Sequence, residues 1–200
     1  MKEGNVVTND TFHNYFDDSG NLLDTVTDDE LIFEGDFSGI DVNYITIDRE
    51  IKFTGKNAIF NGVSFVISSD DVEITGFDLT GSDYALIYLN DVSGVTISDC
   101  KINFTAVEDS ESYAIYAFSV DTLKIINNNI TYVGCTNGNY INNAIRIEGD
   151  EEEEISSDEI IIQKNNFDIT LPSVAIKHPD MYSLENTKIF SAGIDLIYCY

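Results

Sequence analysis

The chain has 200 residues, a formal net charge of −26 at pH 7 and hydrophobic residues at 43% of its positions. This apolar share excludes a chain kept disordered by charge repulsion, and the length is sufficient for one well-filled core. The negative charge argues against nucleic acid and anionic membrane surfaces as partners, because both would repel the protein. No apolar run reaches the length of about 18 residues that a membrane span needs, so we expect no membrane insertion.

Residues 1–30 are predicted to form an N-terminal capping segment. Asn9 and Asp10 are good helix N-caps, and Phe12, Tyr15 and Phe16 would share one face of a short helix. Such an amphipathic cap would cover the open edge of the first strands, which otherwise invites end-to-end pairing.

A five-residue phrase then returns along the chain: apolar, any, apolar, any, turn residue. Its copies start 20, 21, 23, 28 and 37 residues apart. They are Leu31–Gly35, Ile51–Gly55, Val72–Gly76, Val95–Asp99, Leu123–Asn127 and Ile160–Lys164. A period of about 20 to 25 residues built on short strands is typical of a parallel β-solenoid. We therefore predict an all-β fold, a right-handed single-stranded parallel β-helix of about six coils over residues 31–178.

Each repeat has a second half. An interior turn position is followed by another inward apolar residue, at Leu79, Ile102, Ile130 and Phe167. Two of the interior turn positions are Asn128 and Asn165, whose stacked amides would hydrogen-bond along the axis. A further strand closes the later repeats, with its middle residue pointing outward. These strands are predicted at residues 87–89, 115–117, 145–147 and 176–178.

Residues 179–200 lose the repeat and are predicted to form a partial last coil or a cap. Cys100 falls in the interior turn column, where we expect it to pack in the core. Cys135 and Cys199 would either pair with each other or crosslink molecules. The chain begins at Met1 without an apolar signal segment, so it is either cytoplasmic or a fragment, and we favour a fragment of a longer protein.

The residues from about 8 to 178 resemble a known family. The stretches Leu31–Phe37, Tyr44–Gly55, Val72–Gly76, Val95–Asp99 and Ile125–Ile130 are similar to the pectate-lyase-like β-helix repeats of adhesin-like surface proteins of methanogenic archaea. The resemblance implies an extracellular protein exposed at the cell surface. Full-length members usually carry a signal peptide, further repeats and a wall-attachment region, none of which this sequence contains.

The same kind of fold hosts polysaccharide lyases and hydrolases, so an enzyme has to be considered. A lyase needs a calcium-binding carboxylate cluster beside an Arg or Lys, and a hydrolase needs two carboxylates about 5 to 9.5 Å apart. The outward positions of the first strands show no paired carboxylates, and neither Arg49 nor Arg146 neighbours an acidic cluster in the predicted register. His13 and His178 are interpreted as structural. We expect no catalytic activity.

One outward column is a candidate ligand-binding stripe. It places Tyr88, Tyr116, Arg146 and Lys177 on successive coils, and Phe65 is a further candidate at its start. Aromatic rings beside cations would suit stacking on sugar rings or holding an acidic polymer. Alternatively, exposed tyrosines reflect only the preference of Tyr for strands. The insertions at residues 105–113, 131–143 and 148–159 are a rival surface, since loops on rigid scaffolds often carry recognition.

Two further kinds of site are considered. The acidic run at residues 150–154 is interpreted as a solvated hairpin tip, and Asp150, Glu151 and Glu152 are the candidates for a Ca²⁺ site. No other cofactor is expected. Three glycosylation sequons occur, and Asn103 and Asn129 are the candidate acceptors.

The sequence therefore predicts a non-catalytic, cell-surface adhesin-like or wall-structural segment that contacts glycans or proteins of other cells. A carbohydrate-active enzyme of the pectate-lyase-like class is one alternative, and a passive surface spacer is the other.

Overall fold

The structure is a computed structural model that describes residues 5–108, 110–135, 142–149, 156–170, 191–197 and 199. Within these ranges the elements are sixteen β-strands and one short 3-10 helix. No helix in the described ranges has the length and apolarity to cross a membrane.

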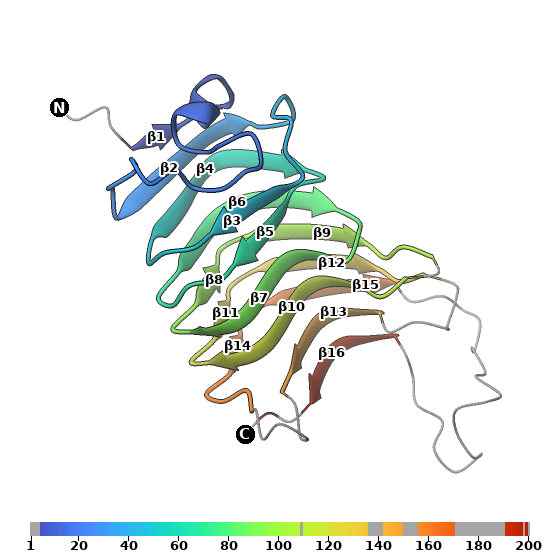
Figure 1. Cartoon of the computed structure of the whole chain (residues 1–200). Helices are drawn as coiled ribbons and strands as arrows, with labels where there is room; N and C mark the ends of the chain where they lie inside the picture. The colour runs from blue at the N-terminus through green and yellow to red at the C-terminus, as the bar shows by residue number, and fades with distance from the viewer. Residues whose placement is uncertain are drawn as a thin grey trace, which may run out of the picture.

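The strands form two parallel sheets, and the chain passes repeatedly from one to the other (Figure 1). The first sheet contains β1 (Val6–Val7), β2 (Glu30–Asp36), β4 (Lys52–Asn61), β6 (Glu73–Gly81), β8 (Thr96–Ser98), β9 (Lys101–Thr105), β11 (Lys124–Ile126), β12 (Asn129–Val133), β14 (Ile161–Gln163) and β15 (Asn166–Thr170). The second sheet contains β3 (Tyr44–Ile47), β5 (Ser64–Ile67), β7 (Ala85–Ser93), β10 (Ser112–Asp121), β13 (Asn142–Glu148) and β16 (Ser191–Ile197). The prediction of an all-β fold with parallel strands is confirmed.

The predicted register of the first sheet is confirmed from β4 onward. Between β2 and β4 it was wrong, because the pairing is shifted by two residues, a shift that keeps the same side chains on the inner face. Ile74 pairs with Ile97, Ile97 with Ile125 and Ile125 with Ile162. The first three of these side chains are fully buried. Period-two alternation sends these residues inward and their neighbours outward, so each repeat adds one layer of branched side chains to a continuous core.

The turn residue of the phrase adopts left-handed backbone geometry in most repeats. Its φ is +98° at Gly35, +80° at Gly76, +54° at Asp99, +61° at Asn127 and +57° at Lys164. Gly, Asn and Asp adopt this conformation more readily than other residues. From Asp99 onward the turn also divides the long strand into two, which is why β8 and β9 succeed the single strand β6.

The interior turn column carries a buried amide ladder, as predicted. Asn128 donates from Nδ2 to Oδ1 of Asn165 at 3.0 Å and to the carbonyl of Ile97 at 3.0 Å. Its Oδ1 accepts the backbone N–H of Cys100 at 2.9 Å. Cys100 is 1% exposed and thus packs in the core as expected. The bond from Cys100 satisfies a backbone N–H that the turn removes from the strand ladder.

The N-terminal segment covers the first layers of the core, and its helix is a single 3-10 helix of six residues. The 3-10 helix Asn9–Asn14 has Thr8 as its N-cap residue, and so the prediction of Asn9 or Asp10 at that place was wrong. The hydroxyl of Thr11 accepts the backbone N–H of Thr8 at 2.9 Å, which satisfies a free donor at the start of the helix. Phe12 and Phe16 are fully buried and stack on each other at 4.6 Å. Phe16 also contacts Phe33, so the cap joins the aromatic core.

The last strand differs from the prediction. Residues 176–178 lie outside the described residues, and the strand that pairs with β13 is β16. Ile194 and Leu196 pair with the inward residues Ile145 and Ile147, yet they are 41% and 51% exposed. The core is thus covered by the N-terminal cap at one end and more open at the last described strands.

Candidate functional site

The candidate stripe lies on the outer face of the second sheet, and its central register is confirmed. Tyr88 pairs with Tyr116, and Tyr116 pairs with Arg146. The next position is occupied by Asp195. Lys177 lies outside the described residues. At the other end of the stripe, Val66 precedes Tyr88.

The proposal of Phe65 at the start of the stripe was therefore wrong. Phe65 pairs with the inward Ile87 and is fully buried. The error is one residue along a strand, which is enough to move a side chain to the opposite face of the sheet.

The stripe belongs to a packed group of four tyrosines, Tyr84, Tyr88, Tyr113 and Tyr116, which we call the outer aromatic cluster. Tyr116 stacks on Tyr88 at 5.4 Å between ring centroids and on Tyr113 at 4.9 Å. Tyr84 meets Tyr113 and Tyr116 edge-on, both at 5.6 Å. Offset stacks and edge contacts of this kind each contribute about 0.5 to 1.5 kcal/mol beyond area burial. The four rings therefore support one another.

Of the three stripe residues that the structure describes, two are not exposed. Tyr116 and Arg146 are each only 8% exposed, and Tyr113 is 1% exposed. Tyr84 is 42% exposed, and Tyr88 is partly exposed. The rings accessible to a ligand are thus Tyr84 and Tyr88, while Tyr113, Tyr116 and Arg146 form their support.

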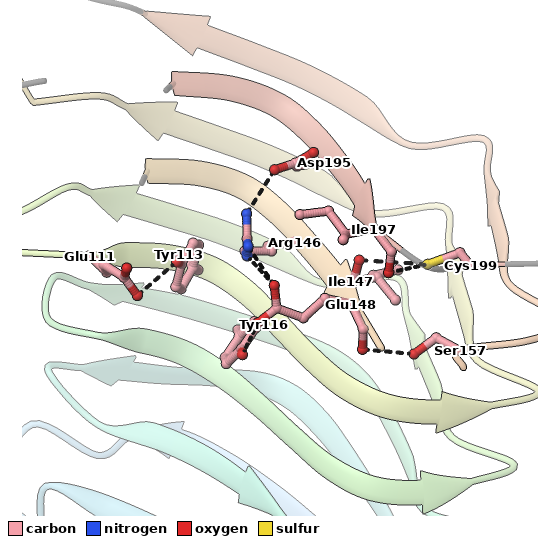
Figure 2. Close-up of polar contacts among 10 residues, drawn as sticks. All are labelled: Glu111, Tyr113, Tyr116, Arg146, Ile147, Glu148, Ser157, Asp195, Ile197 and Cys199. Carbon is pink, nitrogen blue, oxygen red and sulfur yellow. Dashed lines mark hydrogen bonds and ion pairs between the residues drawn. The ribbon is translucent and has the colours of Figure 1, made fainter. Parts of the chain in front are cut away.

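The polar atoms of the support are paired with carboxylates (Figure 2). Arg146 donates from Nε to Glu148 at 2.8 Å and from Nη1 to Asp195 at 2.8 Å. The hydroxyl of Tyr116 donates to Glu148, and that of Tyr113 donates to Glu111 at 3.2 Å. The sequence predicted no acidic cluster beside Arg146, whereas the structure gives it two carboxylate partners. Glu148 is two residues along its own strand, and Asp195 comes from the late strand β16.

The titration of these groups follows from burial and from the carboxylates. Burial raises the pKa of Tyr113 and Tyr116, and Glu111 and Glu148 respectively add to the increase. For Arg146, burial acts to lower the pKa, but the charges of Glu148 and Asp195 outweigh it and the pKa is raised. The cluster therefore holds neutral phenols and a charged guanidinium at neutral pH.

Sequence reasoning missed Tyr84 and Tyr113. Period-two alternation puts Tyr113 and Tyr116 on opposite faces of β10, because they are three residues apart. In the structure the consecutive residues Ala114 and Ile115 are both part of the inner core, which breaks the alternation and brings Tyr113 to the outer face. The sequence feature that could have indicated these two residues was the high frequency of tyrosine around the predicted strands.

A polar pocket of about 380 Å³ lies elsewhere, at the ends of β7 and β10. Carboxylates from three successive repeats line it: Asp70, Asp91 and Asp121. Asp70 accepts a hydrogen bond from the backbone N–H of Ser93, and Asp91 accepts one from the hydroxyl of Ser119. Asp121 accepts one from the hydroxyl of Thr122. This grouping was not expected from the sequence, because Asp91 and Asp121 lie beyond the predicted strands at residues 87–89 and 115–117, in the longer strands β7 and β10.

The other candidates are placed as follows. Asp150, Glu151 and Glu152 lie outside the described residues, and within the described ranges no group of three acidic, His or Cys side chains is arranged to hold a metal. The Asn103 amide donates to Asp78 and Thr80, both at 3.3 Å, whereas Asn129 is exposed, as predicted.

None of the three cysteines forms a disulfide in the described part of the chain. Cys135 accepts a hydrogen bond from Nδ2 of Asn142 at 3.2 Å. Cys199 lies beside the carbonyls of Ile147 and Ile197 at 3.6 Å (Figure 2). Cys135 and Cys199 are therefore not joined to each other in this structure.

No protein-family model, no curated protein and no solved structure matches this chain.

Proposed function

We propose that the chain is a right-handed parallel β-helix of about six coils that acts as a non-catalytic, cell-surface adhesin-like module and contacts carbohydrate. The two parallel sheets support this architecture, since the chain adds strands to each in turn with every repeat. Connections between parallel strands of one sheet are nearly always right-handed, which supports the handedness. The family resemblance of the repeats supports the extracellular location and contact with surface glycans or proteins of other cells.

The observation that carries the binding role is the accessible pair Tyr84 and Tyr88 on a buried support. Aromatic faces suit the apolar faces of sugar rings, and a rigid support lowers the entropy lost on binding. The support is rigid because Tyr116 stacks on Tyr88 and shares Glu148 with Arg146. Of the predicted stripe, the proposal keeps Tyr88 as a binding residue and adds Tyr84. Tyr116 and Arg146 become part of the support.

A glycan-array assay tests the proposal. The wild type is compared with a Tyr84→Ala/Tyr88→Ala double variant and with Tyr44→Ala as the matched control. Tyr44 is 47% exposed on β3 of the same sheet and lies outside the cluster. We expect the double variant to lose binding and the control to retain it.

The other results would each contradict the proposal. Binding that survives in the double variant but is abolished by chelation of calcium would move the site to the acidic insertion at residues 148–159. Binding that survives both changes would move the site to the remaining loops. Absence of binding by the wild type would leave a passive spacer as the better description.

A carbohydrate-active enzyme is a second candidate, favoured by the pocket that Asp70, Asp91 and Asp121 line. Pairs of carboxylates on opposite sides of a sugar are what glycoside hydrolysis requires. The test is incubation with polysaccharides, with new reducing ends and unsaturated products as readouts. Cleavage by the wild type that Asp91→Asn abolishes would establish the enzyme, and absence of cleavage would leave the non-catalytic proposal standing.

A further inference from the structure

The charge around the outer aromatic cluster bears on which glycans it accepts. Arg146 is the only basic residue in the six described strands of the second sheet. Its side chain is 9% exposed, and its guanidinium is already paired with Glu148 and Asp195. A cation that two carboxylates neutralise is not available to an anionic ligand.

The carboxylates that surround the cluster are closer to solvent than the arginine. The side chain of Glu148 is 18% exposed and that of Asp195 is 36% exposed, and Glu111 is partly exposed next to Tyr113. Among the described residues around the cluster, one guanidinium against these three carboxylates leaves a negative balance. The net charge of the whole chain, −26, has the same sign.

The two accessible rings lie within this negative field. Burial raises the pKa of Tyr84, and the charges of Glu111 and Glu148 raise it further. Burial and Glu148 likewise raise the pKa of Tyr88. Burial acts only on the phenols themselves, whereas the carboxylate charges would also act against a negative group of a ligand that lies on these rings.

We propose that the outer aromatic cluster selects neutral glycans and rejects chains that carry uronic acid or other anionic groups. This inference rests on the proposed function and specifies the ligand of the same surface. Of the two ligand types that the sequence suggested for the stripe, sugar rings and an acidic polymer, it retains only the first. The physical reason is that ring stacking is available to neutral and anionic sugars alike, whereas the carboxylates repel only the anionic ones.

The test uses matched ligands that differ in one group. Linear oligosaccharides of glucose, galactose and mannose are each compared with their C6-oxidised uronic counterparts, with affinity measured by calorimetry. At low salt we expect at least one neutral oligosaccharide to bind about tenfold or more tightly than its oxidised counterpart, a difference of about 1.4 kcal/mol. Raising the salt concentration should narrow the ratio and leave the neutral affinity nearly unchanged, because salt screens only the charged interaction.

A variant tests the origin of the selectivity. Glu111→Gln keeps an acceptor for the hydroxyl of Tyr113 and removes one charge. We expect it to reduce the neutral-to-oxidised affinity ratio about threefold or more, a change that corresponds to a weakened like-charge contact. Glu50→Gln, the same change at an exposed position before β4, is the control and should leave the ratio unchanged.

The outcomes separate this inference from the proposed function. Equal or tighter binding of the oxidised oligosaccharides, lost in the Tyr84→Ala/Tyr88→Ala variant, would overturn the selectivity and leave the tyrosine site standing. A ratio insensitive to both salt and Glu111→Gln would also overturn it. Absence of binding to any oligosaccharide would refute the tyrosine site, and the selectivity with it.

Discussion

Tyr116 donates its hydroxyl hydrogen bond to Glu148, the same carboxylate that accepts Nε of Arg146. This shared acceptor connects β10 to β13 on the outer face of the second sheet. It holds the ring of Tyr116 in place beneath the outer aromatic cluster. It also neutralises the positive charge of Arg146, which the sequence had suggested as a ligand-binding group.

Removal of Glu148 is expected to destabilise the protein. Glu148→Ala would leave the hydroxyl of Tyr116 without its acceptor and Arg146 with Asp195 alone. Hydrogen bonds to charged groups are each worth about 1.5 to 3 kcal/mol, so we expect a loss of about 2 to 3 kcal/mol. Urea unfolding followed by circular dichroism measures it. Glu50→Ala, at an exposed position, should change the free energy of unfolding by less than about 0.5 kcal/mol, and an equal effect of both variants would contradict the shared-acceptor role.

The amide ladder should be essential to the later repeats. Asn128→Ala leaves the backbone N–H of Cys100 without a partner inside the core and removes the amide bond to the carbonyl of Ile97. An unsatisfied buried group costs about 1 to 3 kcal/mol, so we expect a loss of about 1 to 3 kcal/mol in the free energy of unfolding. The adjacent exposed Asn129→Ala is the matched control, with an expected change below about 0.5 kcal/mol. A loss for Asn128→Ala no greater than for Asn129→Ala would show that water replaces the amide.

Phe33 is expected to be the most sensitive position of the N-terminal aromatic core. Its ring contacts five others, those of Phe16, Phe37, Phe53, Phe60 and Phe77. Phe33→Ala should cost about 3 to 5 kcal/mol, because the cavity lies between the cap and two layers of the core. Ile32→Ala on the opposite face of β2 is the control and should cost clearly less. Thermal unfolding of the two variants measures the difference, and similar melting temperatures would contradict the special sensitivity of Phe33.

Alkaline pH is expected to destabilise the fold. Burial raises the pKa of the Cys100 thiol from 9.0 to about 11, and burial also raises the pKa of Tyr113 and Tyr116 above 10.0. The unfolded chain loses these protons at lower pH than the folded chain does. The free energy of unfolding should therefore fall as the pH rises above about 9, by up to about 1.4 kcal/mol per pH unit for each group.

The contribution of the thiol can be separated from that of the phenols. Cys100→Ala removes the group that titrates first, so its stability should fall less steeply than that of the wild type between pH 9 and about pH 11. Urea unfolding at several pH values across this window gives both slopes. Identical slopes would show that Cys100 does not contribute.

Much of the strand architecture could be predicted because its information is local. The inward isoleucines at positions 74, 97 and 125 follow period-two alternation, and their register is the predicted one. The Asn128–Asn165 contact was predicted for the same reason, since equivalent positions of successive repeats lie one above the other. The helix N-cap at Thr8 was not predicted, because it lies outside the repeat. The strand β16 lies within the predicted partial last coil, but its pairing with β13 was assigned to residues 176–178 instead.

The candidate site was predicted only in part. Tyr88, Tyr116 and Arg146 are in register, but their exposure depends on residues that the repeat does not place. Tyr113 reaches the outer face because the alternation of β10 breaks at Ala114, and Asp195 reaches Arg146 from about fifty residues along the chain. Neither the orientation of Tyr113 nor the contact of Asp195 with Arg146 follows from the spacing of the repeats.

The sequence by itself determined that this protein is all-β, that its strands pair in parallel at successive repeats, and that Cys100 and Asn128 lie inside. These features follow from side-chain alternation and repeat spacing, which are properties of neighbouring residues. Only the tertiary structure decided that Arg146 is buried between Glu148 and Asp195 and that Tyr84 is the most exposed ring of the cluster. Burial and charge pairing depend on which distant segments meet, and that is settled when the sheets pack.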